Sequence, residues 1–600
     1  MYSDTDYDPS FDPEKLVNEC REMMTEYWQD NPDLHEIVEE KKETARIIAK
    51  LWEGVSEQPA PLLFPGPAPT PSEKAKSLPT ERTLSALDRL GQLKQSPMLQ
   101  WHWVSELKNK IQESQKKIHA TIADNQGEIN HRTNVHNRKC TFQSIEEERD
   151  FRTNLLNDQI QVWKKLLPSL LKKFARISDP RKPGSITHKK TVLLLYGLLA
   201  FVFKISSCRE MNRELSSTVV FGQLKAIFPD IETLPHACTL TRFLEKTNPQ
   251  DIEEANIYLI RDLILNKKLK KLLIHGCLPV TIDGAQKLYR DGVLQDPRWC
   301  ERLVGNEENK RKQQYVYVVE ANLTFKNGLS IPLMSEFLYR NTNQLNDPDG
   351  KQDSETTAFE RLALRLKKYF PRLKLLILGD AMFATTKIME LLRENYWEFI
   401  IRFSKRQLTS LAKMLNSAKK NSVQIPGQPM YRERWQTFYW ENNVHDGFAG
   451  DLNIHLVGCT EHYQEVDKLT GKIEDSYVER AWISSIPITT DKLHELINLG
   501  ARKKELIEDS INTMKNRGYR YKHAFSYDFN AMQGFHYLMR IGLALNSIAE
   551  FSKVIKKYIR SLGCSATLKF IKETLFNPWL PLSWYEDQRK KKSQLCIQME

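Results

Sequence analysis

The segments CLPVTIDG (277–284) and LKLLILGD (373–380) decide the fold of this chain. Each is a short apolar run that ends at or next to an aspartate, Asp283 or Asp380. Short apolar runs bounded by turn residues are typical of buried strands, and ligand sites of α/β sheets collect at the carboxyl ends of the strands. We therefore expect both aspartates at one edge of a sheet, a few ångströms apart.

Strand and helix patterns alternate around these two segments. The runs 313–325 and 329–338 predict two strands, and Asn327-Gly328 between them is a strong hairpin signal. Further patterns predict helices at 354–369 and 385–395 and a strand at 397–403. This order predicts an α/β layer built on a mixed sheet.

Two carboxylates this close together repel each other, and a divalent cation between them removes that penalty. Their hard oxygen atoms suit Mg²⁺ or Mn²⁺. A third acid is expected from a helix beside the sheet, and the segment KKELIEDSINTMK (503–515) is the best source. Glu508, Asn512 and Lys515 share one stripe of that helix. Glu505 and Asp509 are alternatives to Glu508.

Charge is distributed unevenly along the 600 residues, whose formal net charge is +12. Residues 1–57 hold 16 acidic and 6 basic residues, a net of −10, so the rest of the chain carries +22. A basic body of this kind indicates a polyanion partner. The acidic head could dock on that body or form a solvated helix.

Cysteine use and hydropathy restrict the class of protein. The nine cysteines form no CxxC pair, which argues against a disulfide framework and the usual zinc fingers. The first residues lack the apolar segment of a signal peptide. The longest apolar run, 192–203, has 12 residues, whereas a membrane span needs about 20. We expect a cytoplasmic protein with no membrane partner.

With these motifs in order, the sequence resembles the bacterial insertion-sequence DDE transposases, which have an RNase H-like catalytic core. The resemblance runs from about 170 to 560. It rests on TIDG around Asp283, the strands YVYVVEANL and SEF, KQDSE (351–355), LILGDAMFA around Asp380 and IEDSINTMKNRGY around Glu508.

The resemblance implies that Asp283, Asp380 and Glu508 are the catalytic residues and bind two Mg²⁺ ions, or Mn²⁺ in their place. The intervals between the acids are 97 and 128 residues. The longer second interval fits the family's β insertion. The implied activity is two-metal hydrolysis and strand transfer at transposon ends, that is, cut-and-paste DNA transposition. The implied partners are double-stranded DNA, both inverted repeats and target, and a second copy of the chain.

Many relatives carry a Tyr-x₂-Arg-x₃-Glu-x₆-Lys signature around the glutamate. Counted from the glutamate here, the Lys is present as Lys515 and the Arg position holds Lys504. Ala501 stands at the Tyr position, where Arg502 or Tyr519 is a possible substitute. The resemblance thus implies that Lys515, Lys504 and Arg502 bind DNA phosphates.

Composition and resemblance together divide the chain into segments. They are an acidic helical head (1–57), a Pro-rich linker (58–80) with seven of the 27 prolines, an α-helical DNA-binding and dimerisation region (81–275), an RNase H-like core in two parts (276–404 and 496–565), a β-rich insertion (405–495) and a basic C-terminal tail (566–600).

Two other functions stay open at this point. A metal-dependent nuclease would cut DNA without joining it, and sequence does not separate it from a transposase. A domesticated DNA-binding protein would keep the fold without catalysis, although all three acids are intact. Asp353 and Glu355 are interpreted as capping residues before a helix, with a supporting catalytic role as the alternative.

Overall fold

The computed structural model describes residues 142–598, except 293–295, 307–308, 341–352, 407, 422, 427–433, 446–451, 467–472 and 592–594. These residues belong to one compact unit, 135–600. The predicted acidic head, the Pro-rich linker and the first part of the α-helical region lie outside the described residues. None of the described helices is long and apolar enough to cross a membrane.

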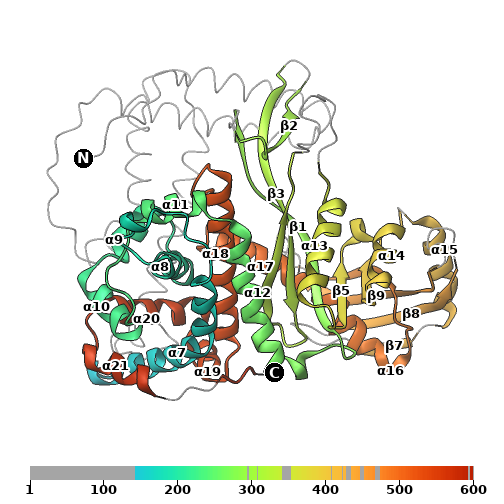
Figure 1. The fold of residues 1–600 in the computed structure, drawn as a ribbon. Coiled ribbons are helices and arrows are strands. Elements are labelled where there is room, and N and C mark those ends of the chain that lie inside the picture. The colour runs from blue at the N-terminus through green and yellow to red at the C-terminus, as the bar shows by residue number, and fades with distance from the viewer. Residues whose placement is uncertain are drawn as a thin grey trace, which may run out of the picture. The chain divides into compact units, whose positions relative to one another are not determined.

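The first part of this unit is helical, as predicted (Figure 1). Its helices are α7 (Ile145–Phe174), α8 (Lys190–Val202), α9 (Cys208–Glu214), α10 (Thr218–Ile227), α11 (Ala237–Lys246) and α12 (Pro249–Leu265). Helix α8 comes from the longest apolar run and is buried at every position from Val192 on. It packs against α18 (Phe529–Glu550), which also contacts α11, α12 and strand β4.

One sheet of ten strands runs through the rest of the unit. Its strands are β1 (Leu278–Asp291), β2 (Cys300–Val304), β3 (Arg311–Thr324), β4 (Ser330–Phe337), β5 (Leu375–Gly379), β6 (Glu398–Arg402), β7 (Val423–Pro426), β8 (Arg434–Val444), β9 (Ile454–Val466) and β10 (Ile473–Ser484). The order is β2-β3-β1-β5-β6-β10-β9-β8-β7, and β4 pairs with β3. Strands β1, β5 and β6 are parallel neighbours, whereas the other pairs are antiparallel, so the sheet is mixed as predicted.

The predicted hairpin is confirmed by the antiparallel pairing of β3 with β4. Gly328 in its turn has a φ of 90°, a left-handed conformation that favours glycine. Strand β2 was not predicted, because CERLV mixes polar and apolar residues too evenly to show a pattern. It pairs with β3, and its Cys300 is buried.

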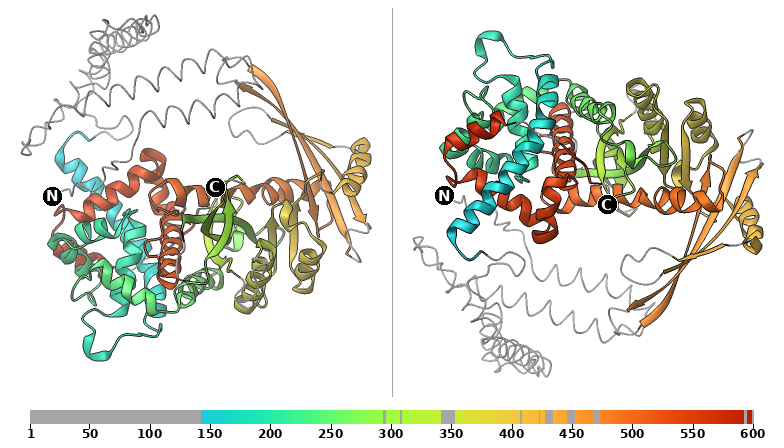
Figure 2. Two further views of the ribbon diagram at one scale, coloured as in Figure 1. Left: turned by 90° about the horizontal axis from the view of Figure 1, so that it is seen from above. Right: turned by 90° about the horizontal axis from the view of Figure 1, so that it is seen from below.

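The predicted β-rich insertion contributes strands β7 to β10 and helix α15 (Thr409–Ser417). These strands extend the core sheet, because β10 pairs with β6 (Figure 2). After the insertion come α16 (Thr490–Leu493), the π-helical turn η7 (His494–Asn498), the 3-10 turn η8 (Ala501–Lys504) and α17 (Glu505–Asn516). Helix α17 packs on β1, β3 and β4. The predicted helices after β4 and β5 are α13 (Glu355–Tyr369) and α14 (Thr386–Glu394).

The chain ends with α19 (Lys553–Leu562), α20 (Cys564–Phe576) and α21 (Leu582–Lys590). The segment predicted as a basic tail, 566–600, thus contains most of α20 and all of α21. Helix α21 packs against α10 and α7, and its Tyr585 is fully buried. The charge run therefore begins in the last turn of a helix whose Tyr585 belongs to the core and whose Trp584 packs against it.

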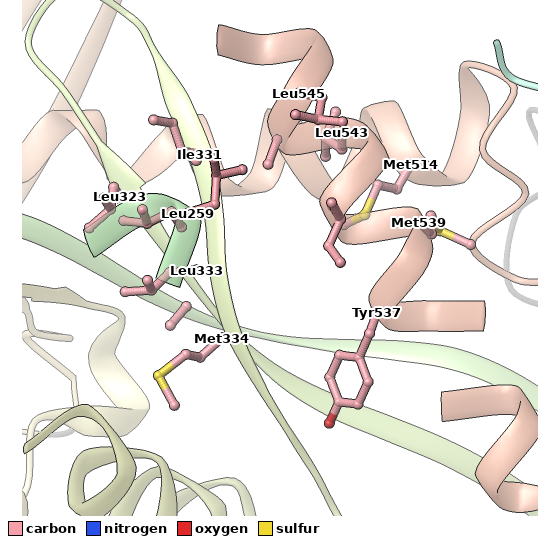
Figure 3. Packing of buried hydrophobic residues seen from close by; sticks show 14 of the residues in the cluster. Leu259, Leu323, Ile331, Leu333, Met334, Met514, Tyr537, Met539, Leu543 and Leu545 are labelled. Atoms are coloured by element: carbon pink, nitrogen blue, oxygen red, sulfur yellow. The ribbon is translucent and has the colours of Figure 1, made fainter. Parts of the chain in front are cut away.

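The main core lies where α12 and α18 meet β3 and β4 (Figure 3). Leu259 of α12, Leu323 and Ile331 of the hairpin, and Tyr537 of α18 are all buried there. Met514 of α17 belongs to the same core, so the helix that carries Glu508 is seated on it. This packing fixes α17 beside the sheet edge that carries the two aspartates.

Candidate active site

Asp283 lies inside strand β1, eight residues before its end, and not at the strand terminus that the sequence predicted. The reason is the hairpin with β3, whose pairing continues to Asp291. Pairing with β5 stops earlier, at Thr281 opposite Leu378. Asp283 therefore lies where the parallel part of the sheet ends, although its own strand continues.

Asp380 follows strand β5 directly and emerges next to Asp283, because β1 and β5 are parallel. Its Oδ1 accepts a hydrogen bond of 2.7 Å from the backbone N–H of Ala381 and caps the 3-10 turn η5 (Ala381–Phe383). A capping role accounts for one carboxylate oxygen. The other, Oδ2, faces the ammonium of Lys504 at 3.6 Å.

The three predicted acids meet around Lys504. Its Nζ lies 3.6 Å from Asp283 Oδ1, and it donates a 2.5 Å hydrogen bond to Glu508 Oε1 one helical turn away. The Lys504 side chain is 14% exposed, whereas those of Asp380 and Glu508 are 44% and 55% exposed. We refer to Asp283, Asp380, Glu508 and Lys504 as the acid cluster.

The alternatives to Glu508 point elsewhere. Glu505 forms an ion pair with Arg480 at 3.7 Å. Asp509 lines a cavity of about 540 Å³ on another side of α17, together with Lys204 and Arg517. Of these three acids, Glu508 is the one that joins Lys504.

Burial raises the pKa of Asp283 to about 6, and the neighbouring Glu508 and Asp380 add to this effect against the opposing charge of Lys504. Burial would lower the pKa of Lys504, but the three carboxylates outweigh it and raise that pKa above its ordinary value. One positive charge faces three acids, so the acid cluster is short of positive charge.

The residues of the acid cluster fit a divalent cation. Three carboxylates from three separate elements supply hard oxygen donors, which Mg²⁺ and Mn²⁺ prefer. Among the described residues, no three His, Cys, Asp or Glu side chains are already arranged as a metal cage. The carboxylates instead surround the Lys504 ammonium.

A buried polar network lies beside the acid cluster. Glu320 is the cross-strand partner of Asp283 in the β1–β3 register and is fully buried. It accepts hydrogen bonds from Tyr521 (2.9 Å) and Ser335 (2.7 Å) and pairs with Arg540 at 2.5 Å. Sequence patterns did not reveal this network, because its members come from three distant segments.

A hydrogen bond links the same region to α17. Asn322 of β3 is fully buried and donates to Ser510 Oγ at 3.0 Å. Ser510 is two residues after Glu508 on the helix. The bond therefore helps to fix the rotation of α17 and, with it, the direction in which Glu508 points.

Glu355 is a fourth acid near the site, and its sequence context predicts a cap, with a supporting catalytic role as the alternative. The cap of α13 is Ser354, which accepts a hydrogen bond from the Thr357 N–H. Glu355 is instead hydrogen-bonded to Tyr317, and burial followed by the charge of Asp380 raises its pKa. Gly284 permits this approach, because a β-carbon there would overlap the Glu355 carboxylate and the Tyr317 ring.

The predicted phosphate-binding residues have different surroundings. Lys515 is half-buried on α17, with its Nζ 5.9 Å from the centre of the Tyr521 ring. Burial, followed by the charge of Lys522, lowers its pKa, and Asp283 acts in the opposite direction. Lys515 therefore lies on the side of α17 that faces Asp283.

Arg502, which the resemblance implies as a phosphate-binding residue, has an ion-pair partner within the chain. Its guanidinium pairs with Glu461 of β9, which is 1% exposed and also pairs with Arg480 at 2.6 Å. Tyr519, the other suggested substitute, is buried, and its hydroxyl accepts from Asn546 at 2.8 Å. Both side chains have internal partners that the sequence could not show, because those partners lie 41 and 27 residues away.

Comparison with known families agrees with this geometry. Residues 347–546 match the family model described as the transposase DDE domain, and residues 171–259 match the model described as DDE_Tnp_1-associated. The first stretch contains Asp380 and Glu508, while Asp283 lies between the two stretches. No curated protein matches the chain. The mixed sheet with its helices is the RNase H-like core that this domain implies, and the two matches indicate a DDE transposase family of the insertion-sequence type.

Proposed function

We propose that this transposase moves DNA by a cut-and-paste reaction, with phosphodiester hydrolysis and strand transfer in one site that uses two divalent ions. The observation that carries the proposal is that the carboxylates of Asp283, Asp380 and Glu508 lie together around the ammonium group of Lys504. These acids come from β1, the end of β5 and α17, up to 225 residues apart. Acids that served only as caps or surface charges would not need to converge.

In this proposal, Asp283, Asp380 and Glu508 hold Mg²⁺, with Mn²⁺ as a substitute. A bound pair of such ions lowers the pKa of an attacking hydroxyl and stabilises the leaving 3′ oxygen. The chain's own part is to fix the three carboxylates, which β1, η5 and α17 do through the backbone. Hydrolysis and strand transfer then differ only in the attacking hydroxyl, water or a DNA 3′ end.

Lys515 and Lys504 are proposed to orient the DNA phosphate beside these acids. Both lie on or next to the helix that carries Glu508, and Lys515 lies seven residues from it on the same stripe. Arg502 is left out of this role because Glu461 holds its guanidinium. The helical region before β1 is proposed to bind the inverted repeats and to dimerise, in line with the chain's positive net charge.

An excision assay tests the proposal. The reading frame with its flanking DNA is placed on a plasmid, and loss of the element is detected by amplification across the empty site. We expect excision with the natural chain and none with Asp380→Asn. Asp509→Asn is the matched control, because it changes an acid of the same region outside the acid cluster. Equal excision with Asp380→Asn would refute the assignment of the acids.

A second assay separates transposition from nuclease activity. An end that already carries a free 3′-OH is incubated with target DNA, protein and Mg²⁺. Joined products support strand transfer, whereas cleavage without joining would support a metal-dependent nuclease. Neither product, with a folded protein that still binds the ends, would favour a DNA-binding protein without catalysis.

A further inference from the structure

The Lys504 ammonium occupies the centre of the site in which the proposed function requires a divalent ion. It lies within 3.6 Å of oxygen atoms from all three acids at once. The Lys504 side chain is also less exposed than those of the three acids, at 14% against 19% for Asp283, 44% for Asp380 and 55% for Glu508. The ammonium thus lies inside the acid cluster, beneath Asp380 and Glu508.

We propose that Lys504 is a resident counter-ion of this site, and that a divalent ion must displace it to bind. Without metal, the ammonium holds the three carboxylates together. With metal, it leaves the cluster and becomes free to contact a DNA phosphate. The inference rests on the proposed function, because it takes the same acids as metal ligands.

Charge balance explains why the two cations exclude each other. The three acids carry three negative charges, and Lys504 supplies one positive charge. Two divalent ions alone would exceed the charge of the acids, and an ammonium kept at the centre would add repulsion without adding a ligand. Since the ammonium and the metal seek the same oxygen atoms, binding of one lowers the affinity for the other.

The local structure allows the side chain to move while its backbone stays fixed. Ala501 is buried, and Arg502 is held by Glu461. These contacts anchor the turn η8, which ends at Lys504. Beyond the anchored backbone, Lys504 has a flexible four-carbon stem. Its compact, strongly hydrated charge leaves an ion pair more readily than the rigid fork of an arginine would.

Metal affinity is the first test, with Mn²⁺ as the probe. The dissociation constant is measured by electron paramagnetic resonance of free Mn²⁺ for the natural chain, Lys504→Met and the neighbouring control Lys503→Met. We expect Lys504→Met to bind Mn²⁺ about tenfold more tightly, and Lys503→Met to bind as the natural chain does. Equal or weaker binding by Lys504→Met would overturn the inference.

Stability without metal is the second readout. In the presence of EDTA, Lys504→Met should melt at a lower temperature than the natural chain, because three acids then repel one another without a counter-ion. Saturating Mn²⁺ should restore most of that loss. An unchanged melting temperature in EDTA would show that Lys504 does not hold the acids together.

Amine labelling tests the displacement itself on the unmodified chain. The rate of Lys504 acetylation is followed by peptide mass spectrometry with and without Mg²⁺. We expect Mg²⁺ to speed labelling of Lys504 but not of Lys503. If Mn²⁺ binds and Asp380→Asn abolishes binding, but Lys504 labelling does not change, only the inference fails. If Mn²⁺ binds no variant, the proposed function fails and the inference with it.

Discussion

Two ion clusters flank the short turn Ala501–Lys504, and their charges are arranged in opposite ways. On one side, the acid cluster joins three carboxylates to Lys504. On the other, Glu461 joins Arg480 and Arg502, which we call the Glu461 cluster. The acid cluster has one positive charge for three negative ones, whereas the Glu461 cluster has two positive charges for one.

The pKa values follow this difference. Burial raises the pKa of Asp283 to about 6, and one lysine does not cancel the effect. Burial also acts to raise the pKa of Glu461, but Arg502, hydrogen bonds and Arg480 outweigh it and lower that pKa below its ordinary value. A structural cluster is satisfied within the chain. The acid cluster is short of positive charge, and we propose that a cation from outside completes it.

The largest expected effect is on catalysis by the acid cluster. Asp283→Asn should slow DNA cleavage about 10³-fold or more, because the three acids act as a unit. Its melting temperature should stay the same or rise, since one repelling charge is removed. Cleavage kinetics and thermal melting of the same preparation check both parts. A folded Asp283→Asn protein with full activity would show that the acid cluster is not catalytic.

The next effect is on stability and concerns the Glu461 cluster. Glu461→Ala should lower the free energy of unfolding by about 3–5 kcal/mol, because it removes the ion pair of the largely buried Arg502 and leaves Arg480 with the 3.7 Å contact to Glu505. Chemical denaturation measures the loss. Glu441→Ala, another acid of the insertion sheet, is the control and should change stability far less. A Glu461→Ala loss no larger than that of the control would remove the structural role assigned here.

The third expected effect concerns how folding stability depends on pH, which should have opposite signs for Asp283 of the acid cluster and Glu461 of the Glu461 cluster. A raised carboxyl pKa means that the folded chain binds more protons than the unfolded chain between about pH 4 and 6. Asp283 therefore contributes less stability as pH rises through this window. Glu461, with its lowered pKa, contributes stability above its unfolded pKa that is lost as pH falls.

The affinity for a metal ion should also depend on pH, because it reports the protonation of Asp283 directly. The carboxylate must lose its proton to bind a metal, so Mn²⁺ affinity should fall by about tenfold per pH unit below pH 6. It should level off above pH 7. Titration calorimetry at several pH values measures it, and an affinity that is constant from pH 5 to 7 would contradict the assigned pKa.

The smallest expected effect belongs to the neighbours of Glu508. Glu505→Gln and Asp509→Asn should each leave DNA cleavage within about twofold of the natural chain, because neither acid touches Lys504. Glu508→Gln, assayed beside them, should behave like Asp283→Asn. A loss in Asp509→Asn equal to that in Glu508→Gln would move the third ligand by one position.

Local patterns together with the family resemblance predict the three acids, although local patterns alone left Glu505 and Asp509 as alternatives to Glu508. Asp283 and Asp380 follow apolar runs that read as strands, and Glu508 lies on a helical stripe with Lys515. Local patterns could not predict partners that the fold brings together. Lys504 and Arg502 look alike in the sequence, yet one meets the acids and the other meets Glu461 of a strand 41 residues earlier.

The same limit explains the other differences from the predictions. The sequence around Glu355 predicts a helix cap. In the fold, β3 places Tyr317 beside Glu355, and Gly284 leaves room for its carboxylate. The end of β1 depends on its pairing with β3, so the strand continues past Asp283. The helices of residues 566–600 were not predicted, because the many lysines of this segment indicated a basic tail. The buried side chains, such as Tyr585, form no clear pattern among them.

The most direct test of the central claim is to locate the metal on the chain. Fe²⁺ takes the place of Mg²⁺, and ascorbate with peroxide then generates radicals that cut the nearby backbone. The account predicts cuts next to residues 283, 380 and 508, which excess Mg²⁺ suppresses and Asp380→Asn abolishes. Cuts elsewhere, or cuts at these residues that survive in Asp380→Asn, would contradict it.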